Sequence, residues 1–356
     1  MIPISKPLIG DAEKQAVLSV LDSGMLVQGP RVAALEEQFA EACRTRHAVA
    51  TSSGTAALHI ALLAHGIGPG DQVVTTPFTF IASASSILLA GAEPVLVDID
   101  ADTFNLDPAL LEAAITPKTR AIMPVHLYGH PCDMDAILDI AGRHNLVVVE
   151  DAAQAIGASY RGQPVGSFGT GCFSLYATKN IMAGEGGMIT TNDENIAESC
   201  RLLRNHGMKR RYYHDRLGHN LRMTDLHAAI ALAQLDRLEE FAARRQANAA
   251  YFSSHLTSVS TPQVQEGCTH AWHQYTVRVD GDRDRDKALE SLHAAGVGAA
   301  VYYPVPVHHQ AYIRDLVGHT RLPVAERAAS EVLSLPVHPG LNAQDLDTIV
   351  KAVNTL

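Results

Sequence analysis

The chain has 356 residues, of which 47% are hydrophobic and 19% charged, and its formal net charge is −10 at pH 7. This length and composition predict a well-packed protein with one large and one smaller domain, and they argue against intrinsic disorder. The negative charge argues against nucleic acid as a partner, because proteins that bind the phosphate backbone normally carry an excess of Lys and Arg.

Secretion, disulfide bonds and membrane insertion are not indicated either. The five cysteines are far apart, odd in number and lack a CxxC pair, so they predict neither a disulfide framework nor a zinc site. The first residues lack the basic and apolar pattern of a signal peptide, and no apolar run reaches the length of a bilayer span. We therefore expect a soluble protein of the reducing cytoplasm, with no membrane contact.

Short apolar segments rich in β-branched residues alternate with helical patterns in the first two thirds of the chain. They cover residues 47–53, 71–77, 93–99, 119–129 and 145–152. This alternation predicts βαβ units and a mainly parallel sheet. Because the segments are apolar almost throughout, we expect helices on both faces of that sheet.

Helical periodicity over residues 224–256 predicts a helix that leads into a second domain. Beyond it we expect a strand over residues 273–281, a helix over 284–296 and a closing helix over 343–356. The predicted division is a large domain of residues 1–245 and a small C-terminal domain of residues 246–356.

The first candidate site is the stretch "SSGT", where a predicted strand ends and an apolar helix begins at once. Ligands of open α/β sheets bind beyond the carboxyl ends of the strands. The small residues Ser52, Ser53, Gly54 and Thr55 let the backbone approach an anion, and a helix N-terminus offers free N–H groups, so the stretch suits a phosphate. An ordinary Ser or Thr helix cap is the alternative, and for this stretch alone it is the more common one.

Two further stretches contain candidate residues. "VVVEDAAQA" places Glu150 and Asp151 at the end of a buried strand, where a carboxylate needs a cationic or hydrogen-bonding partner such as a protonated ring nitrogen. An acidic helix cap is the alternative. "CFSLYATKN" places Lys179 after an apolar run; most lysines are solvated, but desolvation would lower the pKa of this one and free its amine for imine chemistry. Ser174 could add a hydroxyl to the same anion site.

An anion cradle, a strand-end aspartate and a lysine are the three things that pyridoxal phosphate (PLP) requires of a protein. The sequence resembles the sugar aminotransferases of the DegT/DnrJ/EryC1/StrS family. The resemblance runs from end to end through "IPISKPLIG", "SGMLVQGP", "SSGTAALHIAL", "GDQVVTTPFTF", "VEDAAQAIGASY", "FSLYATKN", "GHNLRMTDLHAAIALAQL" and "VYYPVPVHHQ". It implies the α/β fold of PLP-dependent transferases of fold type I, with a large domain built on a mainly parallel mixed sheet flanked by helices and a smaller C-terminal α+β domain.

The resemblance also implies roles for individual residues. Lys179 is similar to the lysine that carries PLP as an internal aldimine, Asp151 to the partner of the pyridine nitrogen, and Gln154 to the residue near the phenolic oxygen. Phe80 is similar to the aromatic residue that stacks on the ring. The phosphate contacts correspond to Gly54, Thr55 and Ser174, and Asn220 to an asparagine that reaches the cofactor of the neighbouring subunit. We therefore expect a homodimer.

The reaction that the resemblance implies is the transfer of an amino group from L-glutamate, through a pyridoxamine phosphate form, to a nucleotide-linked keto sugar. The N-terminal motifs look more like those of members that aminate a 4-keto-6-deoxy sugar than like those that aminate a 3-keto sugar. By resemblance, Tyr303, His308 and His309 lie near the entrance for the sugar nucleotide. Three basic residues, Lys6, Arg210 and Arg211, could meet the diphosphate of a substrate in the partner subunit, or could be solvated surface charges.

The chain departs from the family pattern at Met182 and Ala183, where the family usually has two threonines. Because Lys179 is kept, amine transfer is favoured over dehydration, although a dehydratase, a 3-keto-sugar or cyclitol aminotransferase and a non-catalytic sensor remain as alternatives. The 18 histidines are scattered, and the pairs His308–His309 and His126–His130 lack a convergent cysteine or carboxylate pattern. We therefore expect no metal site.

Overall fold

The computed structural model describes residues 1–279, 283–318 and 320–356. Its centre is a seven-stranded sheet with the order β1-β9-β8-β5-β4-β2-β3, in which only β9 runs against the other strands. Each of the five predicted strand segments contains one of these strands, so the mainly parallel sheet is confirmed. The strands are β1 His47–Thr51, β2 Gln72–Thr75, β3 Glu93–Leu96, β4 Thr119–Ile122, β5 Val147–Asp151, β8 Thr170–Ser174 and β9 Gly187–Thr191.

Helices cover both faces of this sheet, as the apolar strands predict. In β1, Ala48 and Ala50 belong to one buried cluster and Val49 to another, because neighbouring side chains of a strand point to opposite faces. The first cluster includes residues of α2 and α8, and the second includes residues of α3, α4 and α7. The helices of this part are α1 Asp11–Ser23, α2 Pro30–Ala42, α3 Gly54–Ala64, α4 Ala82–Leu89, α5 Pro108–Leu111, α6 Met134–His144, α7 Glu194–Arg204 and α8 Asp225–Leu235.

The single helix predicted over residues 224–256 is wrong in one respect, because the structure has two helices, α8 and α9 Leu238–His255. The break lies at Asp236 and Arg237, where Arg237 has φ −107° and ψ 9°. Its guanidinium lies 4.5 Å from the centre of the Phe241 ring and pairs with Glu240 in the first turn of α9. Local contacts of Arg237 therefore accompany the start of a new helix.

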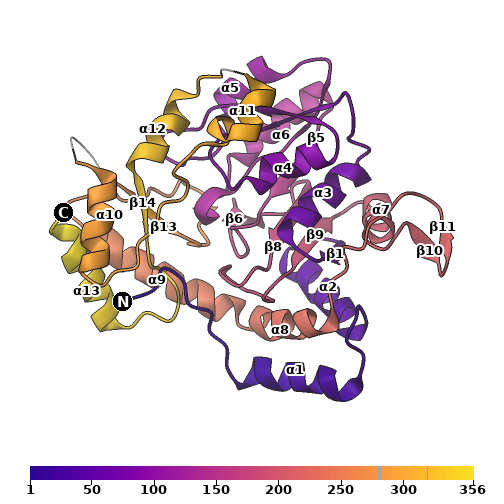
Figure 1. The fold of residues 1–356 in the computed structure, drawn as a ribbon, viewed down its shortest axis with the longest axis horizontal. Coiled ribbons are helices and arrows are strands. Elements are labelled where there is room, and N and C mark those ends of the chain that lie inside the picture. The colour runs from indigo at the N-terminus through magenta and orange to yellow at the C-terminus, as the bar shows by residue number, and fades with distance from the viewer. Residues whose placement is uncertain (280–282, 319) are drawn as a thin grey trace.

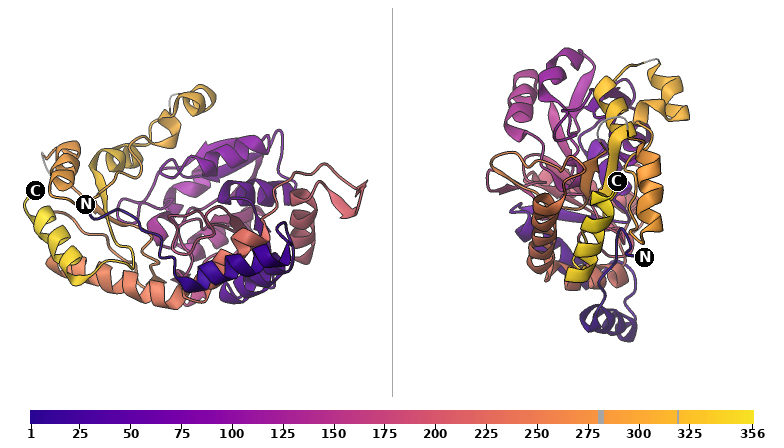
Figure 2. Two further views of the ribbon diagram at one scale, coloured as in Figure 1. Left: turned by 60° about the horizontal axis from the view of Figure 1, so that its bottom comes forward. Right: turned by 90° about the vertical axis from the view of Figure 1, so that its left-hand side faces the viewer.

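The C-terminal part packs around the second half of α9 (Figure 1, Figure 2). A buried cluster joins Ala249 and Phe252 of α9 to a two-stranded antiparallel sheet and to the last helix. The elements of the C-terminal part are β13 Tyr275–Arg278, α10 Arg285–Ala294, α11 Ala311–Val317, α12 Pro323–Glu331, β14 Val332–Leu335 and α13 Ala343–Asn354. Of these, α11 and α12 pack instead against residues of the N-terminal part, such as Ala84 and Phe78. Residues 280 and 281 of the predicted strand lie outside the described residues. The boundary predicted at residue 245 falls inside α9, which is continuous there, and the division into two domains stays a prediction.

Several short elements complete the described chain. The hairpin of β10 and β11 projects from the body of the molecule in Figure 1 and in the left view of Figure 2. None of the described helices has the length and apolarity that a bilayer crossing requires. The short elements are η1 Glu112–Ala114, η2 Leu127–Gly129, β6 Ser159–Tyr160, β7 Gln163–Pro164, β10 Met208–Arg210, β11 Tyr213–His214, β12 Cys268–Thr269 and η3 Val307–His309.

Candidate active site

A cavity of about 570 Å³ lies where β5 and β8 end and α3 begins. This is the place where the strand order predicts a ligand, beyond the carboxyl ends of parallel strands. Eight of the twelve site residues predicted from the sequence line it, namely Gly54, Thr55, Phe80, Asp151, Gln154, Ser174, Lys179 and Tyr303. Lys6, Asn220, His308 and His309 do not.

The start of α3 forms the floor of the predicted anion cradle. Ser53 is the cap of this helix, and its Oγ accepts a hydrogen bond from the N–H of Ala56 at 3.1 Å, so the helix-cap alternative is correct for Ser53. Gly54 and Thr55 form the first turn and face the cavity. A Cβ atom on Gly54 would lie 2.9 Å from Cβ of Ser174, so only glycine lets the helix approach the end of β8 this closely. The cavity therefore receives the N-terminus of α3 together with Ser174.

Asp151 is 5% exposed at the end of β5. Its Oδ2 accepts a hydrogen bond from Ser83 Oγ at 2.7 Å, and its Oδ1 accepts one from the N–H of Ala153 at 3.2 Å. Burial raises the pKa of this carboxyl group, while these hydrogen bonds and Lys179 act in the opposite direction. The chain after Asp151 makes turns and no helix, so the helix-cap alternative is wrong here.

Glu150 does not line the cavity, although it directly precedes Asp151. Its carboxylate is fully buried, accepts N–H groups from residues 166, 168 and 169, and lies 3.1 Å from His126 Nε2. Neighbouring residues of a strand point to opposite faces, so only one of the two acids can reach the cavity. Glu150 therefore holds the turn before β8, and Asp151 alone is available to a ligand.

Lys179 lies in the loop between β8 and β9 and is partly buried. Burial lowers the pKa of its amine to about 8, and Asp151 acts against this shift. The loop is held by hydrogen bonds from Lys179 N–H to Tyr176 O at 2.9 Å and from Ala183 N–H to Leu175 O at 2.7 Å. Met182 is 3% exposed and Ala183 is fully buried, so at these two departures from the family pattern apolar packing supports the loop.

Aromatic side chains form another wall of the cavity. Gln154 accepts a hydrogen bond from the N–H of Tyr128 at 2.7 Å and donates one to Tyr303 Oη at 2.9 Å. The ring of Phe80 is 56% exposed and lies 6.2 Å from the ring of Tyr303. Phe80 therefore offers a free aromatic face, next to a Tyr303 hydroxyl that Gln154 holds in place.

Asn220 is exposed and lies outside the cavity of its own chain, where its backbone pairs with Asn205. Arg210 and Arg211 lie on the projecting hairpin, each over a neighbouring tyrosine ring. Lys6 is also exposed, and it lines a smaller pocket that Lys179 lines from the other side. One chain by itself therefore does not bring these four predicted residues to the cavity.

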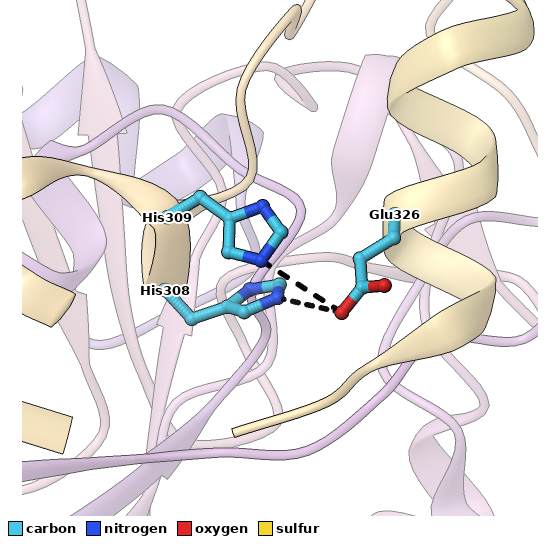
Figure 3. A group of neighbouring side chains, drawn as sticks. All are labelled: His308, His309 and Glu326. Carbon is cyan, nitrogen blue, oxygen red and sulfur yellow. Dashed lines mark hydrogen bonds and ion pairs between the residues drawn. The ribbon is translucent and has the colours of Figure 1, made fainter. Parts of the chain in front are cut away.

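His308 and His309 lie in a different pocket, against Glu326 of α12 (Figure 3). Glu326 Oε1 is 3.2 Å from His308 Nε2 and 3.8 Å from His309 Nε2, and it also accepts the N–H of Leu322 at 2.9 Å. The statement that this histidine pair has no convergent carboxylate is therefore wrong. The fold supplies the carboxylate from a helix further along the chain, and the sequence spacing does not reveal it.

Several residues of the site were not predicted from the sequence. Ser83, which holds Asp151, comes from α4, and only the tertiary structure brings it there. Arg245 and His273 line the cavity. A signal for Arg245 did exist, because it falls on the otherwise largely apolar buried stripe of α9 that includes Phe241 and Phe252.

The residues of this cavity fit PLP. The close approach of Gly54 to Ser174 leaves a cradle for a phosphate, and the buried Asp151 would meet a protonated ring nitrogen. Lys179 supplies a primary amine with a lowered pKa in the same cavity. The cavity therefore combines an anion site, a counter-charge and a nucleophilic amine.

Comparisons with known proteins agree with this geometry. The model of the DegT/DnrJ/EryC1/StrS aminotransferase family matches residues 7–354. A pleiotropic regulatory protein of Geobacillus stearothermophilus is 46% identical over 96% of this chain and 94% of its own length. The GDP-perosamine synthase of Caulobacter vibrioides is 44% identical over 99% of this chain and 97% of its own length. The solved PLP form of a putative sugar aminotransferase from Streptococcus pneumoniae has a TM-score of 0.95 at 32% identity, covering 99% of this chain and 98% of that one.

Proposed function

Because the chain belongs to the DegT/DnrJ/EryC1/StrS family and is a PLP-dependent sugar aminotransferase, we propose that it moves an amino group from L-glutamate to a nucleotide-linked 4-keto-6-deoxy sugar. The observation that carries this proposal is that Lys179 and Asp151 line one cavity with the cradle at Gly54. The relative named as a GDP-perosamine synthase supports a nucleotide-linked sugar. The preference for a 4-keto group rests on the N-terminal motifs.

Each residue of the cavity has a distinct task in this proposal. When bound, the cofactor supplies the electron sink for charge that forms at the carbon bearing the amine. Lys179 anchors the cofactor through its amine and moves the proton at that carbon, and its lowered pKa keeps part of the amine neutral near pH 7. Asp151, oriented by Ser83, stabilises positive charge on the ring nitrogen.

The remaining cavity residues bind and orient the ligands. Gly54, Thr55 and Ser174 bind the phosphate, and Phe80 covers the ring and excludes water from one side. Tyr303, held by Gln154, faces the sugar. Lys6 lines the smaller adjoining pocket and can contact the substrate from there, whereas His308 and His309 are left out because they lie in a different pocket.

The working unit in this proposal is a homodimer, in which Asn220 of one chain reaches the phosphate of the other. Asn220 lies outside its own cavity, so it is free to serve the partner. Exposed apolar side chains on α1 and the segment after it also suit a partner surface. These residues are Leu18, Leu21, Met25, Leu26 and Val27, which are 42% to 69% exposed.

A regulatory function is a second candidate, because one relative is named as a pleiotropic regulatory protein. A sensor needs a pocket that binds a ligand, but it does not need a nucleophilic amine such as that of Lys179. Catalysis and sensing differ in one measurable property, which is turnover.

The test is to incubate the purified protein with PLP, glutamate and a panel of 4-keto and 3-keto UDP-, GDP- and dTDP-sugars. We expect glutamate to remove the yellow absorbance of the lysine-bound cofactor, a 4-keto sugar to restore it, and mass spectrometry to find the amino sugar. Aminated product from 3-keto sugars alone would overturn the choice of substrate. An unchanged spectrum with glutamate would overturn the choice of donor.

A further inference from the structure

Arg245 is a buried arginine that none of the roles above uses. It lies on α9, is 5% exposed and lines the cavity that Lys179 also lines. The two residues also share the smaller adjoining pocket. Lys and Arg are almost never fully buried unless they are paired, so the surroundings of this side chain need an explanation.

The described residues supply Arg245 with no anionic partner. Its Nη1 donates hydrogen bonds to the backbone carbonyl groups of Trp272 at 2.9 Å and His273 at 3.3 Å. Its Nε is buried and has no hydrogen-bond partner in the described part of the chain. No carboxylate of the described residues forms an ion pair with it, whereas the adjacent Arg244 pairs with Glu240 at 3.0 Å.

Neither Lys179 nor His273 offsets this positive charge. Burial lowers the pKa of Arg245 only to about 10, so the guanidinium stays charged at pH 7. Burial lowers the pKa of His273 well below its ordinary value, and the charges of Lys179 and Arg245 add to this effect, so His273 is neutral. A buried positive charge without a counter-charge is costly, and an anion that enters the cavity would offset that cost.

We propose that Arg245 binds the α-carboxylate of the amino-acid donor through a charge-assisted hydrogen bond. The inference rests on the proposed function and names the group that recognises its donor. The carboxylate of an α-amino acid is bonded to the same carbon as the amine, so an amine at Lys179 puts the carboxylate in the cavity that Arg245 also lines. The diphosphate of a nucleotide sugar is several bonds from the keto carbon, and the cofactor phosphate has its own cradle at α3.

In this proposal Arg245 acts in only one half of the reaction, the step with the amino-acid donor. The donor carries a carboxylate at the reacting carbon, whereas the keto sugar does not. Loss of the guanidinium should therefore weaken binding of the donor and leave the step with the sugar nearly unchanged. A purely structural arginine would affect both halves alike.

The experiment compares wild type with Arg245→Met, Arg245→Lys and the control Arg244→Met, whose side chain is 55% exposed. Stopped-flow absorbance of the PLP-loaded proteins gives the apparent dissociation constant for glutamate, and calorimetry gives that for glutarate, which has no amine. For Arg245→Met we expect both constants to rise about 10- to 100-fold, as the loss of a hydrogen bond to a charged group predicts. Arg245→Lys should fall between it and wild type, and Arg244→Met should match wild type.

The step with the sugar is measured as the rate at which the pyridoxamine phosphate form of each protein reacts with the keto sugar that the panel identifies. If Arg245→Met binds glutamate and glutarate like wild type, or weakens UDP, GDP or dTDP binding in place of glutarate binding, the inference fails and the proposed function stands. If wild type reacts with neither glutamate nor aspartate, alanine or glutamine, the donor assignment fails and the inference falls with it. If Arg245→Met does not fold, two other measurements test the inference. The first is the affinity of Arg245→Lys for glutamate and glutarate. The second compares the affinity of wild type for glutarate with that for glutaramide, which has no carboxylate, and equal affinities would overturn the inference.

Discussion

The chemistry of the cavity depends on two residues whose pKa values burial shifts in opposite directions. Burial destabilises the protonated amine of Lys179 and the ionised carboxyl group of Asp151, and each partly restores the charge of the other. Hydrogen bonds from Ser83 and Ala153 stabilise the carboxylate further. The pair thus combines an amine that is partly neutral near pH 7 with a buried carboxyl group whose negative charge a cationic ring nitrogen would stabilise.

A pH series tests this balance at Lys179. Only the neutral amine attacks an aldehyde, so the rate at which cofactor-free protein reacts with added PLP should rise with pH and level off above about 8. For an ordinary solvated lysine, the rate would keep rising until the pH reached about 10.4. Stopped-flow absorbance measures the rate.

Asp151→Asn provides the internal control for that series. Asp151 raises the pKa of Lys179, so removing its charge should move the midpoint of the pH series to a lower value. A wild-type midpoint near that of a solvated lysine, or a midpoint that rises in the variant, would contradict the assigned environment.

At the level of elements, the site depends on how closely α3 approaches β8. Gly54 lets the start of the helix contact Ser174, and Gly187 of β9 has room only for hydrogen, because a Cβ there would lie 2.2 Å from Ser53 O. Gly54 and Gly187 therefore let α3, β8 and β9 approach one another at the phosphate cradle. Gly184, in the loop that follows Lys179, has φ +88°, a conformation that glycine adopts without strain.

Gly54→Ala tests this contact. The added methyl group would meet Ser174, so we expect the affinity for PLP to fall about 10-fold or more and the free energy of unfolding to fall by about 1–3 kcal/mol. Fluorescence titration with PLP and urea unfolding measure the two effects.

Gly142→Ala is the matched control, because no atom lies within 4 Å of a Cβ at this position inside α6. It should leave PLP affinity unchanged and raise the free energy of unfolding by about 0.5–1 kcal/mol. Equal PLP affinity of Gly54→Ala and wild type would rule out the cradle.

At the scale of the whole molecule, one chain builds most of the cavity but not all of the predicted site. Asn220 lies outside its own cavity, and the hairpin with Arg210 and Arg211 projects from the body (Figure 1). The proposed dimer would bring these groups of one chain to the cavity of the other. The proposed active site is thus composite.

Mixing two inactive variants tests the composite site. Lys179→Ala and Asn220→Ala should each lose activity as separate dimers, the first through loss of the amine and the second through weaker PLP binding. In a mixed dimer, the cavity of the Asn220→Ala chain receives an intact Asn220 from its partner and has its own Lys179. Co-refolded mixtures should therefore regain up to half of the wild-type activity per mixed dimer, and no regain would contradict sharing of the site.

The sequence by itself determined the parallel sheet and the main members of the cavity. Strand ends and helix starts are encoded by neighbouring residues, so "SSGT" and "VEDAAQ" each indicated their place at the carboxyl edge of the sheet, whereas Lys179 was indicated only by the apolar run before it. Lys179, Asp151, Gly54 and Ser174 come together there because parallel strands end at one edge. The break between α8 and α9 was missed because the helical periodicity runs through Arg237.

Only the tertiary structure decided which groups meet across long stretches of chain. It brought Ser83 to Asp151, placed Glu326 against His308 and left the guanidinium of Arg245 beside the cavity without a counter-charge from any described residue. None of these contacts follows from local spacing, since each joins elements that the packing of helices on the sheet brings together. Burial is likewise a property of that packing, and it shifts the pKa of each group. The pKa of the Lys179 amine is therefore set only in the folded chain.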